Sequence, residues 1–227
     1  MLREWNQLPE FMRTEEVRPY FESLKCKKVS LVLKRTFDVF ISAFMLIILS
    51  PVMITVSIAI ILDSKGGVFF RQERITQYGK RFKIFKFRTM VANAERLGSQ
   101  VTVKNDMRIT KVGEVLRKFR LDEFPQLINI LIGQMTFVGT RPEATKYVKR
   151  YTPEMMATLL LPAGVTSEAS IKYKDEAKLL EKAENVDDTY VNEVLPGKMK
   201  YNLDNILKFS FLQEMLIMIK TVIAIVR

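Results

Sequence analysis

The longest apolar stretch of the chain contains no charged residue. It runs over residues 39–62 and reads VFISAFMLIILSPVMITVSIAIIL, which is 24 residues. A helix rises about 1.5 Å per residue, so a run of this length can cross a hydrocarbon core about 30 Å thick. The pattern therefore predicts a helix in contact with a membrane.

Pro51 interrupts this run at its middle, directly after Ser50. Proline cannot donate a helix hydrogen bond, and it biases the preceding residue away from helical geometry, so we expect a break or bend. Each remaining arm would reach about 17 Å, roughly half the hydrocarbon thickness. The Ser50 hydroxyl is available for a backbone carbonyl that Pro51 frees. These features favour a re-entrant hairpin and leave open a kinked helix that crosses the membrane.

Basic residues flank the apolar run in equal number. A helix that crosses the membrane usually carries more Lys and Arg on its cytoplasmic side. Five such residues precede the run and five follow it: Lys25, Lys27, Lys28, Lys34 and Arg35, then Lys65, Arg71, Arg74, Lys80 and Arg81. The balance agrees with a hairpin, which we expect over residues 31–62.

The two ends of the chain predict two further segments. Residues 1–30 carry five glutamates and no basic patch leading into an apolar run, so we expect an extension without a secretory signal and with a helix after Pro19. Residues 205–227 place polar side chains such as Glu214 near one face of an apolar helix. That helix either lies in the membrane interface or packs in the core of residues 63–204.

An alternating pattern follows the apolar run. Apolar and polar residues alternate on both sides of a turn at 77–79, which predicts a β-hairpin with strands near 68–74 and 80–87. Four cations interleave with aromatic residues in and beyond the second strand: Arg81, Lys83, Lys86 and Arg88. They form either a platform for phosphate or nucleotide or a solvated face of a half-buried strand.

Helix-forming residues extend from Lys111 to Arg120, and Asp122 and Glu123 follow just before Pro125. Proline suits the first turn of a helix, so a second helix is expected to begin near Asp122, where the positive end of its dipole would attract phosphate. Two adjacent carboxylates there can hold a divalent cation, and one can attack a phosphorus atom. An ordinary helix cap explains the same acids.

Two loops come after the apolar run 127–132. Arg141 lies between Gly139 and Pro142 in a turn, and arginine suits bidentate contact with a pyrophosphate, although a plain surface turn explains it equally. The segment 161–167, LPAGVTS, is expected to be a loop whose small residues let a nucleotide approach the backbone.

Composition narrows the chemistry. The chain has 227 residues, 48% of them hydrophobic, which suffices for one domain with appendages and a buried core. The predicted helices together with one β-hairpin indicate an α+β class, mainly α. Lys and Arg outnumber Asp and Glu by 36 to 25, which favours phosphates, nucleotides or anionic lipid. Histidine is absent and Cys26 is the single cysteine, so His-based triads, His-ligated metals, intramolecular disulfides and multi-cysteine zinc sites are excluded.

In this order, the motifs resemble the bacterial sugar transferases, the monotopic phosphoglycosyl transferases that start capsule, exopolysaccharide and glycan assembly. The resemblance runs from about Leu33 to the C-terminus. Its strings are KRTFD (34–38), Ser50-Pro51, FFRQER (69–74), KFRTM (86–90), NDMRITKVGEVLRKFRLDEFPQ (105–126) and FVGTRPE (137–143). The chain departs from the commoner family pattern at Thr76, Met107, Thr140 and 163–167.

The resemblance implies a reaction and a site. Asp122 would attack the sugar-bearing phosphate of a UDP-sugar, releasing UMP, and polyprenyl (undecaprenyl) phosphate would resolve the covalent intermediate at the cytoplasmic face of the bacterial inner membrane. Glu123 would join Asp122 at Mg²⁺. Lys86, Arg88 and Arg141 would bind the diphosphate, and Ser50-Pro51 would form the break of the re-entrant hairpin.

Two rival functions remain open from the sequence. A basic nucleic-acid-binding protein would explain the charge and the basic-aromatic strand, but the uncharged run argues against it, so we expect no nucleic-acid partner. A membrane scaffold without catalysis would explain the basic surface, but it does not require both acids together with Arg141.

Overall fold

The fold is mainly helical with two small sheets, in agreement with the expected class. The computed structural model describes residues 2–92, 94, 106–174, 176 and 185–226. Met1, Asn105 and Arg227, which belong to segments or motifs expected from the sequence, lie outside this part. In chain order its helices and strands are α1 (Arg18–Lys25), α2 (Lys28–Asp63), β1 (Phe69–Ile75), β2 (Arg81–Phe87), α3 (Lys111–Lys118), α4 (Gln126–Leu131), β3 (Met135–Val138), α5 (Thr145–Val148), β4 (Ala163–Thr166), α6 (Glu168–Lys172), α8 (Val186–Thr189), α9 (Leu195–Leu207) and α10 (Phe211–Val226). Short 3-10 segments occupy Trp5–Gln7, Glu10–Met12, Gln77–Gly79, Leu121–Glu123 and Glu154–Leu160, and a π-helix occupies Tyr190–Val194.

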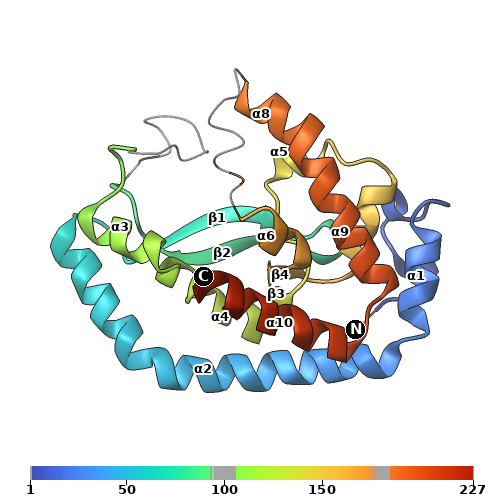
Figure 1. Cartoon of the computed structure of the whole chain (residues 1–227), viewed down its shortest axis with the longest axis horizontal. Helices are drawn as coiled ribbons and strands as arrows, with labels where there is room; N and C mark the ends of the chain where they lie inside the picture. The colour runs from blue at the N-terminus through green and yellow to red at the C-terminus, as the bar shows by residue number, and fades with distance from the viewer. Residues whose placement is uncertain (1, 93, 95–105, 175, 177–184, 227) are drawn as a thin grey trace.

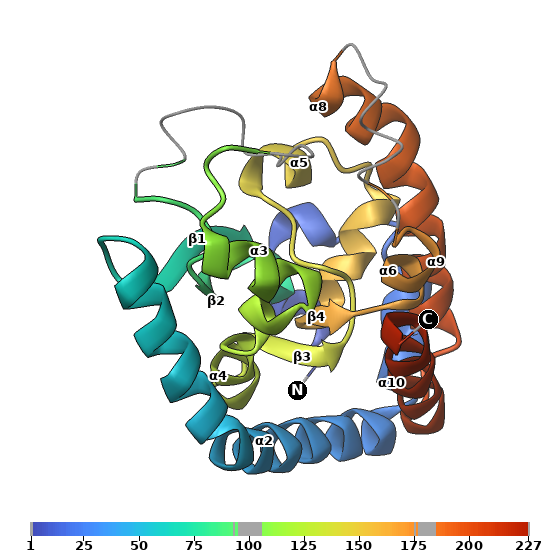
Figure 2. The same ribbon diagram turned by 60° about the vertical axis from the view of Figure 1, so that its left-hand side comes forward.

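Helix α2 contains the apolar run and is bent, not interrupted. It starts at Lys28, three residues before the expected segment, and continues through Pro51. Figures 1 and 2 show it passing along one side of the molecule and then turning up beside the hairpin. Pro51 has no N–H for the carbonyl of Ile47, and the Ser50 hydroxyl donates to that carbonyl at 2.7 Å. The expected hydrogen bond from Ser50 to a carbonyl freed by Pro51 is thereby confirmed.

The polarity of α2 is inverted relative to a helix of a soluble protein. Its buried polar residues Lys34, Asp38 and Ser42 recur every four positions and so share one face. Asp38 accepts hydrogen bonds from the Thr136 hydroxyl at 2.6 Å and from the Phe137 N–H at 3.2 Å. In the most apolar 18-residue window of α2, only 6% is buried. By length and composition, α2 could cross a membrane.

Helix α10 repeats this inversion. The expected C-terminal segment is divided, because α9 ends at Leu207 and α10 begins at Phe211. Glu214 turns inward to an ion pair with Lys34 of α2, and the Thr221 hydroxyl meets that of Thr166 at 2.8 Å. Large apolar side chains of α10 face outward: Leu212, Leu216, Ile219, Val222 and Ile223. The outward face of α10 is therefore apolar, which suits an interfacial helix better than a helix in a soluble core.

The β1–β2 hairpin is confirmed, whereas the second sheet was not expected. Strands β1 and β2 pair antiparallel around the turn Gln77–Gly79. Strands β3 and β4 pair in parallel, so the segment expected as a nucleotide-binding loop is in part a strand. A Cβ on Gly164 would lie 2.2 Å from the backbone nitrogen of Gly139. The small size of Gly164 is therefore explained by the close approach of β4 to Gly139, without a nucleotide.

The N-terminal extension is part of the core. Met12, Val17, Phe21 and Leu24 are buried in one cluster with residues of the segment Glu154–Leu160 and of α9. Helix α1 begins at Arg18, in agreement with the helix expected after Pro19. Figure 1 shows α1 beside α9 and at the start of α2, so the extension packs as an integral part of the fold.

Candidate active site

The two acids lie in a 3-10 turn that ends at Glu123, shortly before α4 begins at Gln126. The turn spans Leu121–Glu123 and follows Arg120, whose φ is +53°. Neither this turn nor α4 has a side-chain cap hydrogen bond, so capping does not account for Asp122 and Glu123. The neighbouring side chains Leu121 and Phe124 pack in a cluster that includes Ile60 of α2. The position of the acids is thus tied to the second arm of the bent helix.

Glu123 is held by two cations at one oxygen. Its Oε1 accepts from Lys86 Nζ at 2.8 Å and from Arg141 at 2.7 Å. Burial by itself would raise the pKa of Glu123, but the two positive charges and the hydrogen bonds they donate outweigh it and hold the pKa far below its usual range. Glu123 is therefore ionised at every physiological pH.

Asp122 is buried to the same degree but is poorly compensated. Both carboxylate side chains are 14% exposed, yet in the described part of the chain the ion pair of Asp122 is with Lys86 Nζ at 4.0 Å, which is too long for a hydrogen bond. Burial raises the pKa of Asp122 above its ordinary value, Lys86 opposes the rise and Glu123 adds to it. A largely buried carboxylate with a raised pKa and no hydrogen-bonded cation is both basic and weakly solvated, as a nucleophile should be.

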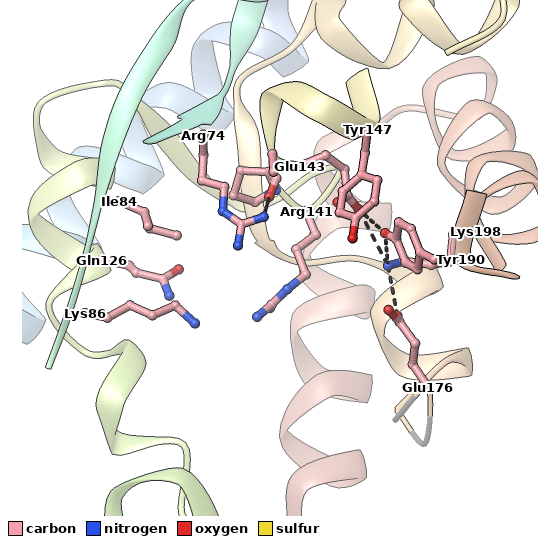
Figure 3. Close-up of a pocket in the computed structure, with 12 residues that line it drawn as sticks. Arg74, Ile84, Lys86, Gln126, Arg141, Glu143, Tyr147, Glu176, Tyr190 and Lys198 are labelled. Atoms are coloured by element: carbon pink, nitrogen blue, oxygen red, sulfur yellow. Dashed lines mark hydrogen bonds and ion pairs between the residues drawn. The ribbon is translucent and has the colours of Figure 1, made fainter. Parts of the chain in front are cut away.

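A cavity of about 200 Å³ is lined in part by Lys86 and Arg141, the two cations that bind Glu123, although neither acid is itself a lining residue. Part of its lining is rich in nitrogen donors. We call Arg74, Lys86, Gln126 and Arg141 the donor wall. Figure 3 shows their nitrogen atoms pointing toward a common space, with Lys86 and Gln126 on one side, Arg74 above and Arg141 facing Lys86 from the other side. Three cations and an amide around one space favour a ligand with several anionic oxygens.

The opposite side of the cavity consists of groups that bind one another. We call Glu143, Glu176, Tyr190 and Lys198 the paired wall. Lys198 Nζ donates to Glu176 at 2.9 Å and to the Tyr190 hydroxyl at 3.1 Å, and that hydroxyl donates to Glu143. Burial and then the charge of Glu143 raise the pKa of Tyr190, so its hydroxyl stays protonated. This wall is a closed network that shapes the cavity.

Arg88 does not join the other expected substrate-binding residues. Its guanidinium donates to three backbone carbonyls at the end of α2: to Lys65 at 2.8 Å, to Ser64 at 2.7 Å and to Ile60 at 3.2 Å. A cation suits the negative end of a helix dipole and satisfies carbonyls that lack helical partners. The described geometry gives Arg88 the role of fixing the end of α2 and offers no support for diphosphate binding.

The register of the β1–β2 hairpin places Arg74 on the same face as Lys86, which the sequence pattern did not predict. Arg74 pairs with Phe82, Gln72 with Ile84 and Phe70 with Lys86, so Arg74, Ile84 and Lys86 share one face of the hairpin. Arg81 and Lys83 alternate onto the other face. The cations expected near one surface are therefore divided, with Arg81 and Lys83 on one face of the hairpin and Lys86 on the other. Arg74 and Gln126 stand inside strings of the family resemblance, and the register adds Arg74 to the site.

The acids suit a magnesium ion in kind. Both cations that bind Glu123 contact Oε1, so the ion pairs leave its Oε2 available, and Asp122 lacks a close cation. No group of three or more His, Cys, Asp or Glu side chains that could hold a metal occurs in the described residues. Mg²⁺ is commonly bound by one or two carboxylates together with water and substrate phosphates, which agrees with this two-acid set.

The sequence matches a family model and several curated relatives. Residues 29–227 match the model of the bacterial sugar transferases. A UDP-glucose:undecaprenyl-phosphate glucose-1-phosphate transferase of Klebsiella pneumoniae is 38% identical over 181 residues, which are 76% of this chain and 39% of the relative. A UDP-N-acetylgalactosamine-undecaprenyl-phosphate N-acetylgalactosaminephosphotransferase of Aeromonas hydrophila is 33% identical over 193 residues, 84% of this chain and 43% of the relative.

A third relative carries another sugar in its name. The undecaprenyl-phosphate galactose phosphotransferase of Salmonella typhimurium is 37% identical over 155 residues, 62% of this chain and 32% of the relative. The chain thus spans about a third to two fifths of the length of these three relatives. The family match covers all the segments that form the cavity and both acids, and it leaves out only residues 1–28. This chain belongs to the bacterial sugar transferase family.

Proposed function

We propose that this chain is a phosphoglycosyl transferase that moves a sugar-1-phosphate from a UDP-sugar to polyprenyl phosphate, with undecaprenyl phosphate as the lipid. The observation that carries the proposal is a largely buried Asp122 that lies 4.0 Å from Lys86, a residue of the donor wall, whose cations suit a diphosphate. Family membership and the printed names of the relatives support the same reaction.

The reaction takes two displacements at one phosphorus atom. A carboxylate oxygen of Asp122 attacks the sugar-bearing phosphorus, the bond from that phosphorus to the bridging oxygen breaks, and UMP leaves with that oxygen. A phosphate oxygen of the lipid then attacks the same phosphorus and displaces the Asp122 carboxylate. The products are polyprenyl-diphosphate-sugar and UMP, and the first would initiate capsule, exopolysaccharide or glycan assembly.

The cations of the site have distinct tasks in this scheme. Lys86 and Arg141 neutralise Glu123 at rest and donate to the diphosphate when it binds, and Arg74 approaches the same space from the other end of the hairpin face. Mg²⁺ bound by Asp122 and Glu123 would neutralise phosphate charge and so ease attack by an anion. The raised pKa of Asp122 keeps the attacking oxygen basic.

The membrane helices set the depth of the reaction. Residues Met45, Leu46 and Leu49 of α2 pack against the cluster that contains Leu127 and Ile130 of α4, directly after the acids. The phosphate of the lipid lies at the headgroup level of the membrane. Because α4, which follows the acids, packs directly on α2, the active site would lie close to that level, where the lipid phosphate can enter it. We propose that α2 is a re-entrant hairpin at the cytoplasmic face of the bacterial inner membrane, with α10 in the interface.

Donor and reaction are tested together. Purified full-length protein is incubated with undecaprenyl phosphate, Mg²⁺ and a panel of UDP-sugars, and released UMP is measured. UMP from one or a few donors, accompanied by a lipid-linked sugar, supports the proposal. Absence of UMP with every donor, in a preparation that is folded, favours a scaffold without catalysis.

Topology needs a separate test. Single cysteines replace Val29 and Lys65, which are exposed near the two ends of α2, in a background without Cys26. Both are expected to react with an impermeant thiol reagent from the cytoplasmic side only. Labelling from opposite sides would establish a helix that crosses the membrane and would contradict the hairpin.

A further inference from the structure

Gln126 is a buried polar residue of the cavity that the reaction scheme has not used. It is 2% exposed, lies in the first turn of α4 and lines the cavity next to Lys86. Its Nε2 has no hydrogen-bond partner in the part of the chain that the structure describes. Burial of an amide donor without a partner destabilises a fold, so such a group needs an explanation.

The position of this donor distinguishes it from other unpaired atoms. Two other described side chains have a buried polar atom without a partner, Thr14 and Arg88, and neither lines the cavity. The rest of the Arg88 guanidinium is saturated by the end of α2. Figure 3 shows the Gln126 amide turned into the cavity, toward the space that Lys86 and Arg141 also approach. Its missing partner is therefore expected from a ligand.

The surroundings decide the kind of ligand. The neighbouring groups that converge on this space are the cations Arg74, Lys86 and Arg141, so the region is strongly positive. A fourth cation there would repel the others, whereas a neutral amide adds a donor without adding charge. An anionic group with more oxygens than the three cations occupy fits this arrangement, and a diphosphate is such a group.

We propose that Gln126 is a substrate-binding residue whose Nε2 donates to a non-bridging oxygen of the nucleotide-sugar diphosphate. This assignment rests on the proposed function and deepens it, since it adds a neutral donor that helps to orient the phosphorus for attack by Asp122. A positioned donor of this kind contributes through geometry. The fold retains an amide that is unpaired without substrate and satisfied with it.

The test uses a difference between stability and binding. Gln126→Met keeps the length and removes the unpaired amide, so the ligand-free protein should melt at the same temperature or higher. Its affinity for UDP with Mg²⁺, measured by ligand-induced thermal shift and calorimetry, should fall about 10- to 100-fold, as for loss of a hydrogen bond to a charged group. With the active donor, kcat/KM should fall by a similar factor.

A matched control has the opposite signature. Gln77 Nε2 donates to the Leu160 carbonyl at 2.9 Å, away from the cavity. Gln77→Met should lower the melting temperature and leave UDP affinity unchanged. Gln126→Glu should bind UDP more weakly than Gln126→Met, because a carboxylate repels phosphate. A Glu variant that binds UDP better than the Met variant would overturn the phosphate assignment.

The outcomes separate this proposal from the reaction on which it rests. Unchanged UDP affinity and kcat/KM in Gln126→Met would overturn the role of Gln126 and leave the transferase proposal standing. Wild-type protein that binds UDP through Gln126 but transfers no sugar phosphate would support the role of Gln126 and contradict the transferase proposal. Wild-type protein that fails to bind UDP would overturn both the role of Gln126 and the transferase proposal.

Discussion

The donor wall and the paired wall line the same cavity but differ in how completely their polar groups are satisfied within the wall. In the paired wall, Lys198, Tyr190 and Glu143 satisfy one another, and Glu176 completes the network. In the donor wall, Gln126 is unpaired, and nearby Asp122 lacks a close cation. Most buried polar groups of a fold are hydrogen-bonded, so an exception that faces a cavity rich in cations is a place to expect a ligand.

The difference provides a general criterion. Replacing an unpaired group should preserve or raise the free energy of unfolding and lower activity, because the group is costly to the fold and useful to the reaction. Replacing a member of a closed network should lower the free energy of unfolding and leave the activity of each folded molecule nearly unchanged. The following variants are ordered by their expected loss of activity.

Asp122→Asn should have the largest effect. An amide is a poor nucleophile, so the rate of UMP release should fall by at least about 10³-fold. The melting temperature should be equal or higher at pH 7, because burial disfavours the charged form that the substitution removes. Asp187→Asn removes a carboxylate exposed on the surface and is the control with wild-type activity. Turnover near wild type in Asp122→Asn would contradict a nucleophilic role.

Glu123→Gln should come next. It removes the shared counter-charge of Lys86 and Arg141 and one ligand of the proposed Mg²⁺, so kcat/KM should fall about 10²-fold. Raising Mg²⁺ should recover part of the rate if the task of Glu123 is to bind the ion. Titration of Mg²⁺ against initial rate measures this, and a rate independent of Mg²⁺ in both proteins would remove the ion from the account.

Lys86→Met should lower kcat/KM about tenfold and also change the pH profile. The pKa of Asp122 is raised by burial, so wild-type activity should fall on the acid side with a midpoint above 3.8, while Glu123 stays ionised. Lys86 opposes the rise, so its removal should move this midpoint to higher pH. A midpoint that stays in place, in rates measured across pH with the active donor, would contradict the coupling.

The same shift fixes the sign of one stability effect. Between pH 3.8 and the higher pKa of folded Asp122, the folded state binds more protons than the unfolded state. The contribution of Asp122 to stability therefore decreases as pH rises through this window. Asp122→Asn should lose that decrease, which melting curves across the same pH range can measure against wild type.

Lys198→Met should have the smallest effect on activity and a large one on stability. It leaves the buried Glu143 and the partly exposed Glu176 without their shared cation, which should lower the free energy of unfolding by about 3 kcal/mol. The rate per folded molecule should stay within a few-fold of wild type. A large loss of activity with unchanged melting temperature would show that the paired wall acts in the reaction.

Local patterns predicted much of this molecule. The β1–β2 hairpin follows from strict alternation around Gln77–Gly79, and α3 follows from its run of helix formers. The hydrogen bond of Ser50 follows from backbone chemistry, because Pro51 has no N–H and the carbonyl that it leaves free needs another donor. Among the expected site residues, Lys86, Glu123 and Arg141 are joined by direct ion pairs, with Asp122 4.0 Å from Lys86.

The features that sequence patterns missed depend on contacts between distant segments. Strands β3 and β4 are four residues each and pair in parallel, so neither shows a long alternation. Arg88 stands directly after the end of β2 at Phe87, where alternation no longer fixes its direction, and it turns to α2. The unpaired amide of Gln126 depends on which residues surround it, a property that composition and spacing do not encode.

The measurement that tests the central claim most directly is exchange of labelled UMP into the UDP-sugar donor in the absence of any lipid acceptor. A covalent phosphosugar on Asp122 makes the first displacement reversible by itself, so wild-type protein with Mg²⁺ should incorporate label into the donor, and Asp122→Asn should incorporate none. Wild-type protein that transfers sugar phosphate to undecaprenyl phosphate but shows no exchange without it would contradict the aspartyl intermediate and require direct transfer between the two substrates.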